Sequence, residues 1–380
     1  MKKGLLIFIS LQLLFLTACW DSNEIEDLGM IMGIGLDYNE SNDDVFSMTN
    51  QYVVPNNIEG TQFGSSGGTP YQNITLNGSN FFQIIRENSL ETDRPPNYTH
   101  LKSIVLTERL LKEEPLKQLI SFFLRDHEFR RTVAVFITKE SASDILAVEP
   151  TKEMFPAVQL KELTQNHDRS LYVQETLKFG EVSKKITEGA SFVIPEVGIN
   201  QGRIRLLGAG IISDKSQQIV GWLTPEEIAG LKWITNKVSG GLVAIKEKNS
   251  EADQAVLEIT KASTSIEPVL KDGQLTIQLT VKSSLKLAED WEIKRDVFQE
   301  GWEDELKKQG EKVVKEEIEH VISIAQEQKL DYLEFGTWTS IKQPAYWQKH
   351  HKDWERIFAQ LPVTIDVDFT LTGYGTQDIN

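Results

Sequence analysis

The alternation of apolar and polar positions predicts a strand-rich first half of the chain. Residues 28–38 are apolar and punctuated by glycine, and residues 45–54 place apolar side chains on one alternating face. The polar run 39–44 between them has turn composition, so the two segments predict a hairpin. The glycine- and serine-rich residues 55–73 then predict a mobile loop. Further strands are predicted at 100–107, 131–138, 190–199, 204–213 and 218–223.

Helical periodicity separates these strands. The strongest local signal lies at 224–236, where Thr224, Pro225 and Glu227 suit the N-cap, N1 and N3 positions and form a capping box. Ser79 is a candidate N-cap for a helix that ends at residue 90. Because helices and strands are interspersed without a regular strand–helix–strand rhythm, their order favours an α+β fold. Other helices are predicted at 115–125, from Ser141 or Ser143 to 148, at 158–165 and at 171–187.

The last third of the chain predicts a sheet on a long helix. Residues 294–328 carry one apolar stripe, with Glu and Lys on the opposite face. Asp272 and Gly273 form a hairpin turn signal between two alternating segments. We therefore expect an antiparallel sheet packed on a long helix. The alternating strands are predicted at 242–246, 255–266, 274–287 and 361–372, and a shorter aromatic helix at 346–359.

The 380 residues leave room for two or three domains of ordinary size. The predicted fold class is α+β, with three consecutive mixed sheet/helix domains. After a leader at 1–18, we expect an N-terminal α+β domain at 19–188 and a C-terminal α+β domain with the long helix at 224–380. Between them we expect a middle β-rich region at 189–223, and the sequence leaves open whether it forms a separate small domain with part of the N-terminal region.

The first 19 residues have the pattern of an export signal. Lys2 and Lys3 give a positive start, and 4–16 is an apolar run that is short for a bilayer span but typical of a signal peptide. The segment closes in the letters LTAC, which resembles the bacterial lipobox. That resemblance implies cleavage before Cys19, a diacylglyceryl thioether on its sulfur and an acyl group on its new amino terminus. The alternative is a plain signal or short anchor that ends in cysteine.

Composition narrows the function classes. The formal net charge is −16, and loss of residues 1–18 removes two lysines and no acid, which leaves −18 on the mature chain. Such a chain lacks the basic footprint of a general nucleic-acid binder. Cys19 is the only cysteine, which excludes intrachain disulfides and CxxC metal sites. No later stretch approaches 18 apolar residues, so membrane attachment would rest on the acyl chains, and two suffice for stable anchoring.

The residues contain no catalytic or cofactor motif. The six histidines form no HExxH pattern, and the adjacent His350 and His351 would not point at one site on a helix. The Gly-x-Gly pairs at 33–35 and 208–210 do not complete a dinucleotide fingerprint, so they suit strand glycines. Four tryptophans in the last 80 residues predict either core or an aromatic partner-binding patch; they are Trp302, Trp338, Trp347 and Trp354.

From Cys19 onward the chain reads CWDSNEIEDL, which resembles the mature start of the Ger(x)C family of spore germination lipoproteins, the C subunits of germinant receptors. The resemblance covers essentially the whole chain. Residues 331–336 depart from the more glycine-rich, Phe-containing stretch usual in the family. The resemblance continues at 33–37, 208–210, 219–223, 227–233, Pro344, Trp347, Trp354, Phe358 and 363–372.

The resemblance implies a three-domain α+β protein without enzymatic activity, cofactor or metal. It implies lipid anchoring through Cys19 on the outer face of the spore inner membrane. The implied partners are an integral membrane A subunit and a transporter-like B subunit, which respond together to nutrients. The alternative is a solute-binding lipoprotein of a membrane transporter, which shares the export signal but normally has two lobes rich in strand–helix–strand units.

Overall fold

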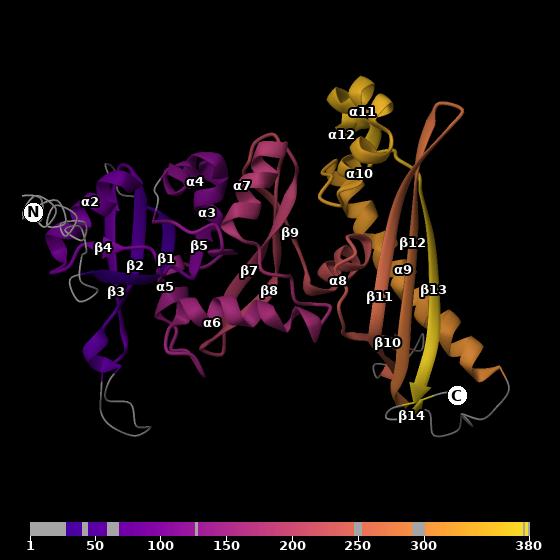
Figure 1. Cartoon of the computed structure of the whole chain (residues 1–380), viewed down its shortest axis with the longest axis horizontal. Helices are drawn as coiled ribbons and strands as arrows, with labels where there is room; N and C mark the ends of the chain where they lie inside the picture. The colour runs from indigo at the N-terminus through magenta and orange to yellow at the C-terminus, as the bar shows by residue number, and fades with distance from the viewer. Residues whose placement is uncertain are drawn as a thin grey trace, which may run out of the picture.

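The computed structural model describes residues 28–39, 45–58, 68–125, 128–246, 253–290, 301–374 and 377–378. Within these ranges the chain forms a nine-stranded sheet followed by a five-stranded sheet, each covered by helices (Figure 1). The predicted α+β class is confirmed. The strand order is β3-β2-β1-β5-β6-β7-β8-β9 in the first sheet, where the short strand β4 (Pro96–Asn97) lies beside β1, and β10-β11-β12-β13-β14 in the second.

The first sheet begins with the predicted hairpin and continues as a parallel core. Strand β1 (Gly29–Tyr38) pairs antiparallel with β2 (Phe46–Val53), which confirms the hairpin. Strand β1 then pairs parallel with β5 (Ser103–Thr107), which pairs parallel with β6 (Ala134–Thr138). Every residue of β5 and β6 is buried, because helices cover both faces. This run of parallel strands is more regular than the sequence pattern predicted.

Helices cover the two faces of this sheet with separate apolar cores. Alternate residues of each strand point to opposite faces, so Ile104 joins one core and Val105 the other. The first core lies under α2 (Phe81–Glu91), α3 (Glu108–Glu113), α4 (Leu116–Arg125) and α7 (Phe179–Glu188). The second lies under α5 (Ala142–Ala147) and α6 (Pro156–Leu163).

Three sequence predictions in this region differ from the structure. Residues 71–73 were expected in a loop but begin strand β3 (Tyr71–Gly78), which pairs along β2. Asn80, and not Ser79, caps α2 by accepting a hydrogen bond from the Gln83 amide at 2.9 Å. Residues 171–178 are not helical, because the Leu177 carbonyl accepts from the Val135 amide at 2.9 Å and holds the segment along β6.

The predicted middle region supplies the far edge of the same sheet. Strand β7 (Phe192–Asn200) touches β6, and it pairs antiparallel with β8 (Arg203–Ile212), which pairs with β9 (Ile219–Leu223). These strands therefore continue the sheet that the N-terminal part of the chain begins. The Gly-x-Gly pairs at 33–35 and 208–210 lie inside strands. The division of the chain into domains stays a prediction.

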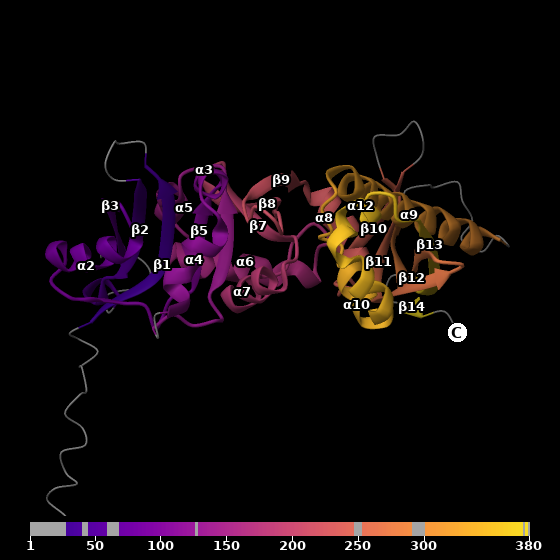
Figure 2. The same ribbon diagram turned by 90° about the horizontal axis from the view of Figure 1, so that it is seen from above.

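The second sheet packs on the long helix, as predicted (Figure 2). Helix α9 (Trp302–Gln328) covers one face; of its predicted extent from 294, residues 294–300 lie outside the described residues. The predicted antiparallel arrangement is wrong at one pairing. Strand β13 (Val363–Tyr374) pairs parallel with β12, whereas the other pairings in this sheet are antiparallel. The crossover through α9 explains this, because it carries the chain across the sheet before β13. The other strands are β10 (Leu242–Lys246), β11 (Asp253–Lys271), β12 (Gln274–Asp290) and β14 (Gln377–Asp378).

Short helices follow α9 where one aromatic helix was predicted. Helix α10 (Phe335–Lys342) was not anticipated, and 344–358 divides into α11 (Pro344–His350), a 3₁₀ turn and α12 (Trp354–Phe358). Among the four tryptophans, Trp302 is buried in the core. The others are partly exposed.

Helix α8 (Pro225–Ile234) lies between the two sheets (Figure 1). Its predicted capping box is confirmed: the Glu227 amide donates to Thr224 Oγ1 at 3.3 Å, and the Thr224 amide donates to Glu227 Oε2 at 2.7 Å. Every residue from 228 to 234 is buried, so α8 is covered on all sides rather than along one stripe. The helix is therefore a central element of the junction.

Candidate functional site at the junction of the two sheets

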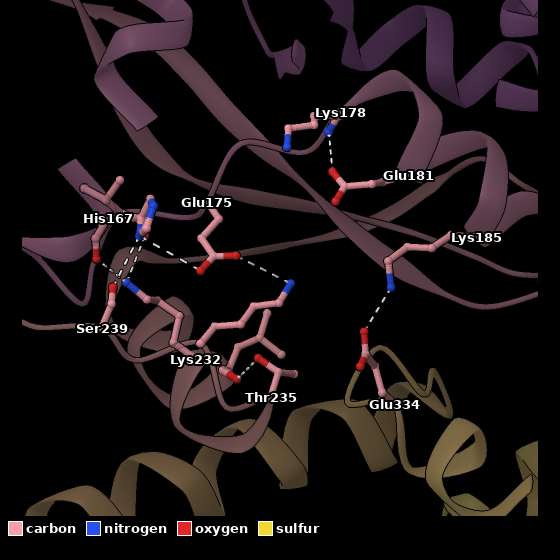
Figure 3. Close-up of polar contacts among 12 residues, drawn as sticks. His167, Glu175, Lys178, Glu181, Lys185, Lys232, Thr235, Ser239 and Glu334 are labelled. Carbon is pink, nitrogen blue, oxygen red and sulfur yellow. Dashed lines mark hydrogen bonds and ion pairs between the residues drawn. The ribbon is translucent and has the colours of Figure 1, made fainter. Parts of the chain in front are cut away.

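A buried lysine fastens α8 to the first half of the molecule (Figure 3). Only 1% of Lys232 is exposed, and its Nζ donates to the carbonyls of His167 at 2.8 Å, Ser170 at 3.1 Å and Val173 at 3.3 Å. Burial lowers the pKa of Lys232 to about 8, although the negative charge of Glu175 opposes that shift. The three carbonyls lie at and after the 3₁₀ turn η3 (Thr164–Asp168), so this side chain joins two segments more than 50 residues apart.

Glu175 gathers further polar groups beside this lysine. Its carboxylate lies 4.0 Å from His167 Nδ1 and 3.9 Å from Lys237 Nζ. The hydroxyl of Ser239 is 3.4 Å from the same histidine nitrogen. Figure 3 shows these groups converging on one side of the segment that leaves α8. Because Glu175 and Ser239 both approach Nδ1 of His167, the arrangement is a closely packed polar contact between segments and does not order the three side chains as a serine–histidine–carboxylate relay.

On its other side α8 packs tightly on α9. A Cβ at Gly230 would lie 2.6 Å from the Glu317 carbonyl oxygen and 2.6 Å from Val321 Cγ2, so only glycine allows this approach. Burial raises the pKa of the Glu317 carboxyl to about 7. The indole of Trp233 favours the charged form and so opposes this shift. Glu317 Oε2 makes no hydrogen bond to the described residues. The α8–α9 contact thus contains a carboxyl that is easily protonated.

A cleft of about 370 Å³ opens between the two sheets, beyond α8. The ion pair of Lys215 with Glu355 on α12 crosses it. A second ion pair also joins the two halves of the chain, since Lys185 Nζ on α7 lies 3.0 Å from Glu334 Oε1 (Figure 3). Both acidic and basic groups line the cleft. The charged lining residues are Glu188, Asp214, Lys215, Lys329, Asp331, Lys352 and Glu355.

An aspartate organises the aromatic wall of this cleft. Asp331 accepts hydrogen bonds from the Phe335 amide at 3.1 Å, the Gly336 amide at 2.6 Å and Trp354 Nε1 at 2.8 Å. Burial raises the pKa of this carboxyl, and the three hydrogen bonds oppose that shift. The Trp354 ring meets Trp347 edge to face, with centroids 5.0 Å apart. Residues 331–336 and the two tryptophans singled out by the sequence therefore form one cluster.

Gly336 lies where this cluster leaves no room for a side chain. A Cβ there would be 2.8 Å from Trp354 Nε1 and 3.0 Å from Asp331 Oδ2. We expect Gly336→Ala to lower the free energy of unfolding by about 1–2 kcal/mol, because the indole must move away from the carboxylate. Denaturant unfolding followed by tryptophan fluorescence measures this. Thr337→Ala is the control and should change stability by less than about 0.5 kcal/mol; equal effects of the two would contradict the account.

The junction is held by packing, hydrogen bonds and ion pairs between the two halves of the chain. In the parts of the chain that the structure describes, no three His, Cys, Asp or Glu side chains are grouped to hold a metal ion. Within the same ranges, no helix is long and apolar enough to cross a bilayer. Cys19, the predicted lipidation residue, lies outside the described residues. Sequence reasoning missed Lys232 and Glu317, since a lone lysine or glutamate in a helical pattern predicts a solvated face.

Comparisons with known proteins match this chain to spore germination proteins. Residues 21–199 match the family described as spore germination protein N-terminal domain, and residues 207–375 match the family described as spore germination B3/GerAC like, C-terminal. Spore germination protein B3 of Bacillus subtilis is 29% identical over 368 residues, covering 96% of each chain. Spore germination protein A3 of the same organism is 29% identical over 374 residues, covering 97% of this chain and 96% of that one.

A solved structure shares the fold. The crystal structure of the GerBC protein aligns with a TM-score of 0.60 and 24% sequence identity. The alignment covers 92% of this chain and 99% of that chain. The α+β fold expected from the family resemblance is therefore confirmed, and the expected number of three domains stays a prediction.

Proposed function

Because the chain belongs to the B3/GerAC-like family of spore germination proteins, we propose that it is the non-enzymatic, lipid-anchored C subunit of a spore germinant receptor. In this proposal it assembles with integral membrane A and B subunits on the outer face of the spore inner membrane. The observation that carries the proposal is the match of both family domains to nearly the full chain. The lipobox ending at Cys19, just before the first match, supports the anchor.

Deletion of the gene tests the receptor role. Spores without this protein should lose the germination response to one class of nutrient while other responses continue. The measurement is the fall in optical density of purified spores after each nutrient is added, with a non-nutrient germinant as the control for spore integrity. An unchanged response to every nutrient would overturn the receptor assignment.

Cys19→Ala tests the anchor. Without the thiol, the precursor cannot accept a diacylglyceryl group, so it should retain its leader and incorporate no labelled fatty acid. The germination response should weaken with it, because the chain loses the apolar burial of two acyl chains. Ser22→Ala is the control and should be acylated normally. Equal fatty-acid labelling of the Cys19→Ala variant and the parent chain would contradict lipidation at this residue.

The cleft between the sheets favours one second candidate, a solute-binding lipoprotein. Ligands often bind where two parts of a protein meet, and the cleft of about 370 Å³ has both charges and an aromatic pair. The parallel strands β1, β5 and β6 also weaken the sequence argument against this class. A thermal-shift screen with amino acids, sugars and nucleosides separates the two, because a bound solute raises the melting temperature. No shift with any of them would remove this candidate.

A further inference from the structure

Helix α2 exposes apolar side chains on the side that faces away from the sheet. Its inner side is filled by Phe81, Ile84 and Asn88, which are buried. On the outer side, Phe82 is 54% exposed and Leu90 is 84% exposed. A helix on the surface of a protein normally keeps such residues on one side only. The outer side of α2 therefore carries apolar surface that the described part of the chain leaves uncovered.

These exposed residues lie along one stripe. Arg86 falls between Phe82 and Leu90 at four-residue spacing, and its guanidinium lies 5.0 Å from the centre of the Phe82 ring. Phe122 on α4 extends the stripe, since its ring meets Phe82 with centroids 5.9 Å apart. We call Phe82, Arg86 and Leu90, together with the adjoining Phe122 of α4, the outer face of α2. An apolar surface with one cation at its centre suits the boundary between lipid headgroups and acyl chains.

The start of the described chain lies at the same end of the molecule. The Gly29 amide donates to the Pro95 carbonyl at 2.9 Å, a few residues after α2 ends at Glu91. Figure 1 places α2 at one end of the long axis and the second sheet at the opposite end. Only eight residues lie between Cys19 and Leu28, so an anchored Cys19 would hold this end within about 30 Å of the bilayer.

We propose that the outer face of α2 rests in the membrane interface, so that the lipid anchor and this helix together fix the orientation of the protein on the bilayer. The proposal rests on the lipid anchoring given under the proposed function. The negative charge of the protein indicates which kind of lipid this face would contact. The mature chain carries −18, and Glu87 and Glu91 flank Arg86 on the same helix. The contact is therefore apolar in origin, independent of anionic lipid and insensitive to salt.

A fluorescent label tests the contact in the acylated full-length mature chain. Because the only natural cysteine, Cys19, carries the lipid, Leu90→Cys supplies a single free thiol for an environment-sensitive dye. Ile341→Cys is the matched control, since Ile341 is 61% exposed on α10 at the far end of the molecule. On neutral phosphatidylcholine vesicles, the dye at 90 should shift to the blue and be quenched by nitroxide-labelled lipid. The dye at 341 should do neither.

The outcomes separate this inference from the anchor itself. If the chain floats with the vesicles but the dye at 90 stays as unquenched as the dye at 341, the contact is overturned while the anchor stands. If the chain does not float, the proposed anchor fails and the inference with it. A blue shift at 90 without vesicles would overturn the lipid contact in favour of cover by protein. Quenching only with anionic lipid at low salt would also overturn it.

A second substitution tests the stripe without risk to the core. Phe82→Ser removes an exposed ring, so the chain should fold normally, as circular dichroism will verify. With the dye at 90, this change should at least halve the quenching by nitroxide-labelled lipid. The matched change Val220→Ser, at another exposed apolar residue on β9, should leave the quenching unchanged. Equal quenching in both variants would overturn a role of the stripe.

Discussion

Replacement of Lys232 by methionine is expected to lower the free energy of unfolding by about 3 kcal/mol. Methionine fills a similar volume but donates no hydrogen bond, so the carbonyls of His167, Ser170 and Val173 lose the ammonium that they share. Each buried carbonyl without a donor costs about 1–3 kcal/mol, and removal of a buried charge offsets part of that cost. Denaturant unfolding at neutral pH measures the difference.

Lys237→Met is the matched control for this change. Lys237 lies on the same segment and pairs with Glu175 at 3.9 Å, but more than a third of its side chain is exposed. Surface pairs of this kind contribute about 0–1 kcal/mol, so the control should change stability little. If both variants lost the same stability, Lys232 would not be the link that its three hydrogen bonds indicate. Limited proteolysis near residues 164–175 should increase in Lys232→Met alone.

The second large effect is a dependence of stability on pH at Glu317. Its pKa is raised from 4.5 to about 7 in the folded protein by burial. An unfolded chain releases this proton at lower pH, so the free energy of unfolding should fall as pH rises from about 4.5 to 7 and then stay level. From the raised pKa, the fall is at most about 3 kcal/mol. Glu317→Gln keeps the shape without the proton equilibrium, so it should remove this fall and stabilise the protein at pH 8.

A variant of the neighbouring Glu316 separates the effect of Glu317 on pH-dependent stability from that of other buried carboxyls. Glu316→Gln changes an exposed glutamate whose nearest described cation is Lys312 at 3.8 Å, so its pH profile should follow that of the unchanged chain. The readout is the difference in free energy of unfolding between pH 5 and pH 8 for all three proteins. Identical differences in the Glu317→Gln variant and the unchanged chain would refute the assignment. Asp37 and Asp331 also have raised pKa values, but they contribute equally to each protein and cancel.

Both effects concern the fastening of α8. Lys232 binds the helix to the segment after η3 in the first half, and Gly230 and Glu317 bring it against α9 in the second half. The contact between the two halves of the molecule therefore depends on one short helix. This helix also gave the clearest local signal in the sequence. Its capping box involves residues three apart, so neighbours along the chain are enough to specify where it begins. Its buried lysine has partners 59 to 65 residues away, which no local pattern reveals.

The same distinction explains the departures in the strands. The hairpin of β1 and β2 follows from two alternating segments around a polar turn. Strand β3 was hidden because its ladder lies against β2 across a glycine-rich segment, and the parallel pairing of β12 with β13 depends on the path of α9 between them. Residues 171–178 have an apolar spacing compatible with a helix, but residues 171–173 form a turn and a bend, and contact with β6 at 177–178 fixes the end of the segment.

The sequence by itself determined the α+β class, the long helix on a sheet and the family resemblance, because each depends on residue types at short spacing. The export signal ending at Cys19 rests on the same kind of pattern and stays a prediction. Only the tertiary structure decided that 189–223 completes the first sheet, that Asp331, Gly336 and two tryptophans form one wall, and that α2 exposes apolar side chains at the end of the molecule where the described chain begins. Those features depend on which distant segments meet. Burial and pairing across the fold set them, and a one-dimensional pattern does not record such contacts.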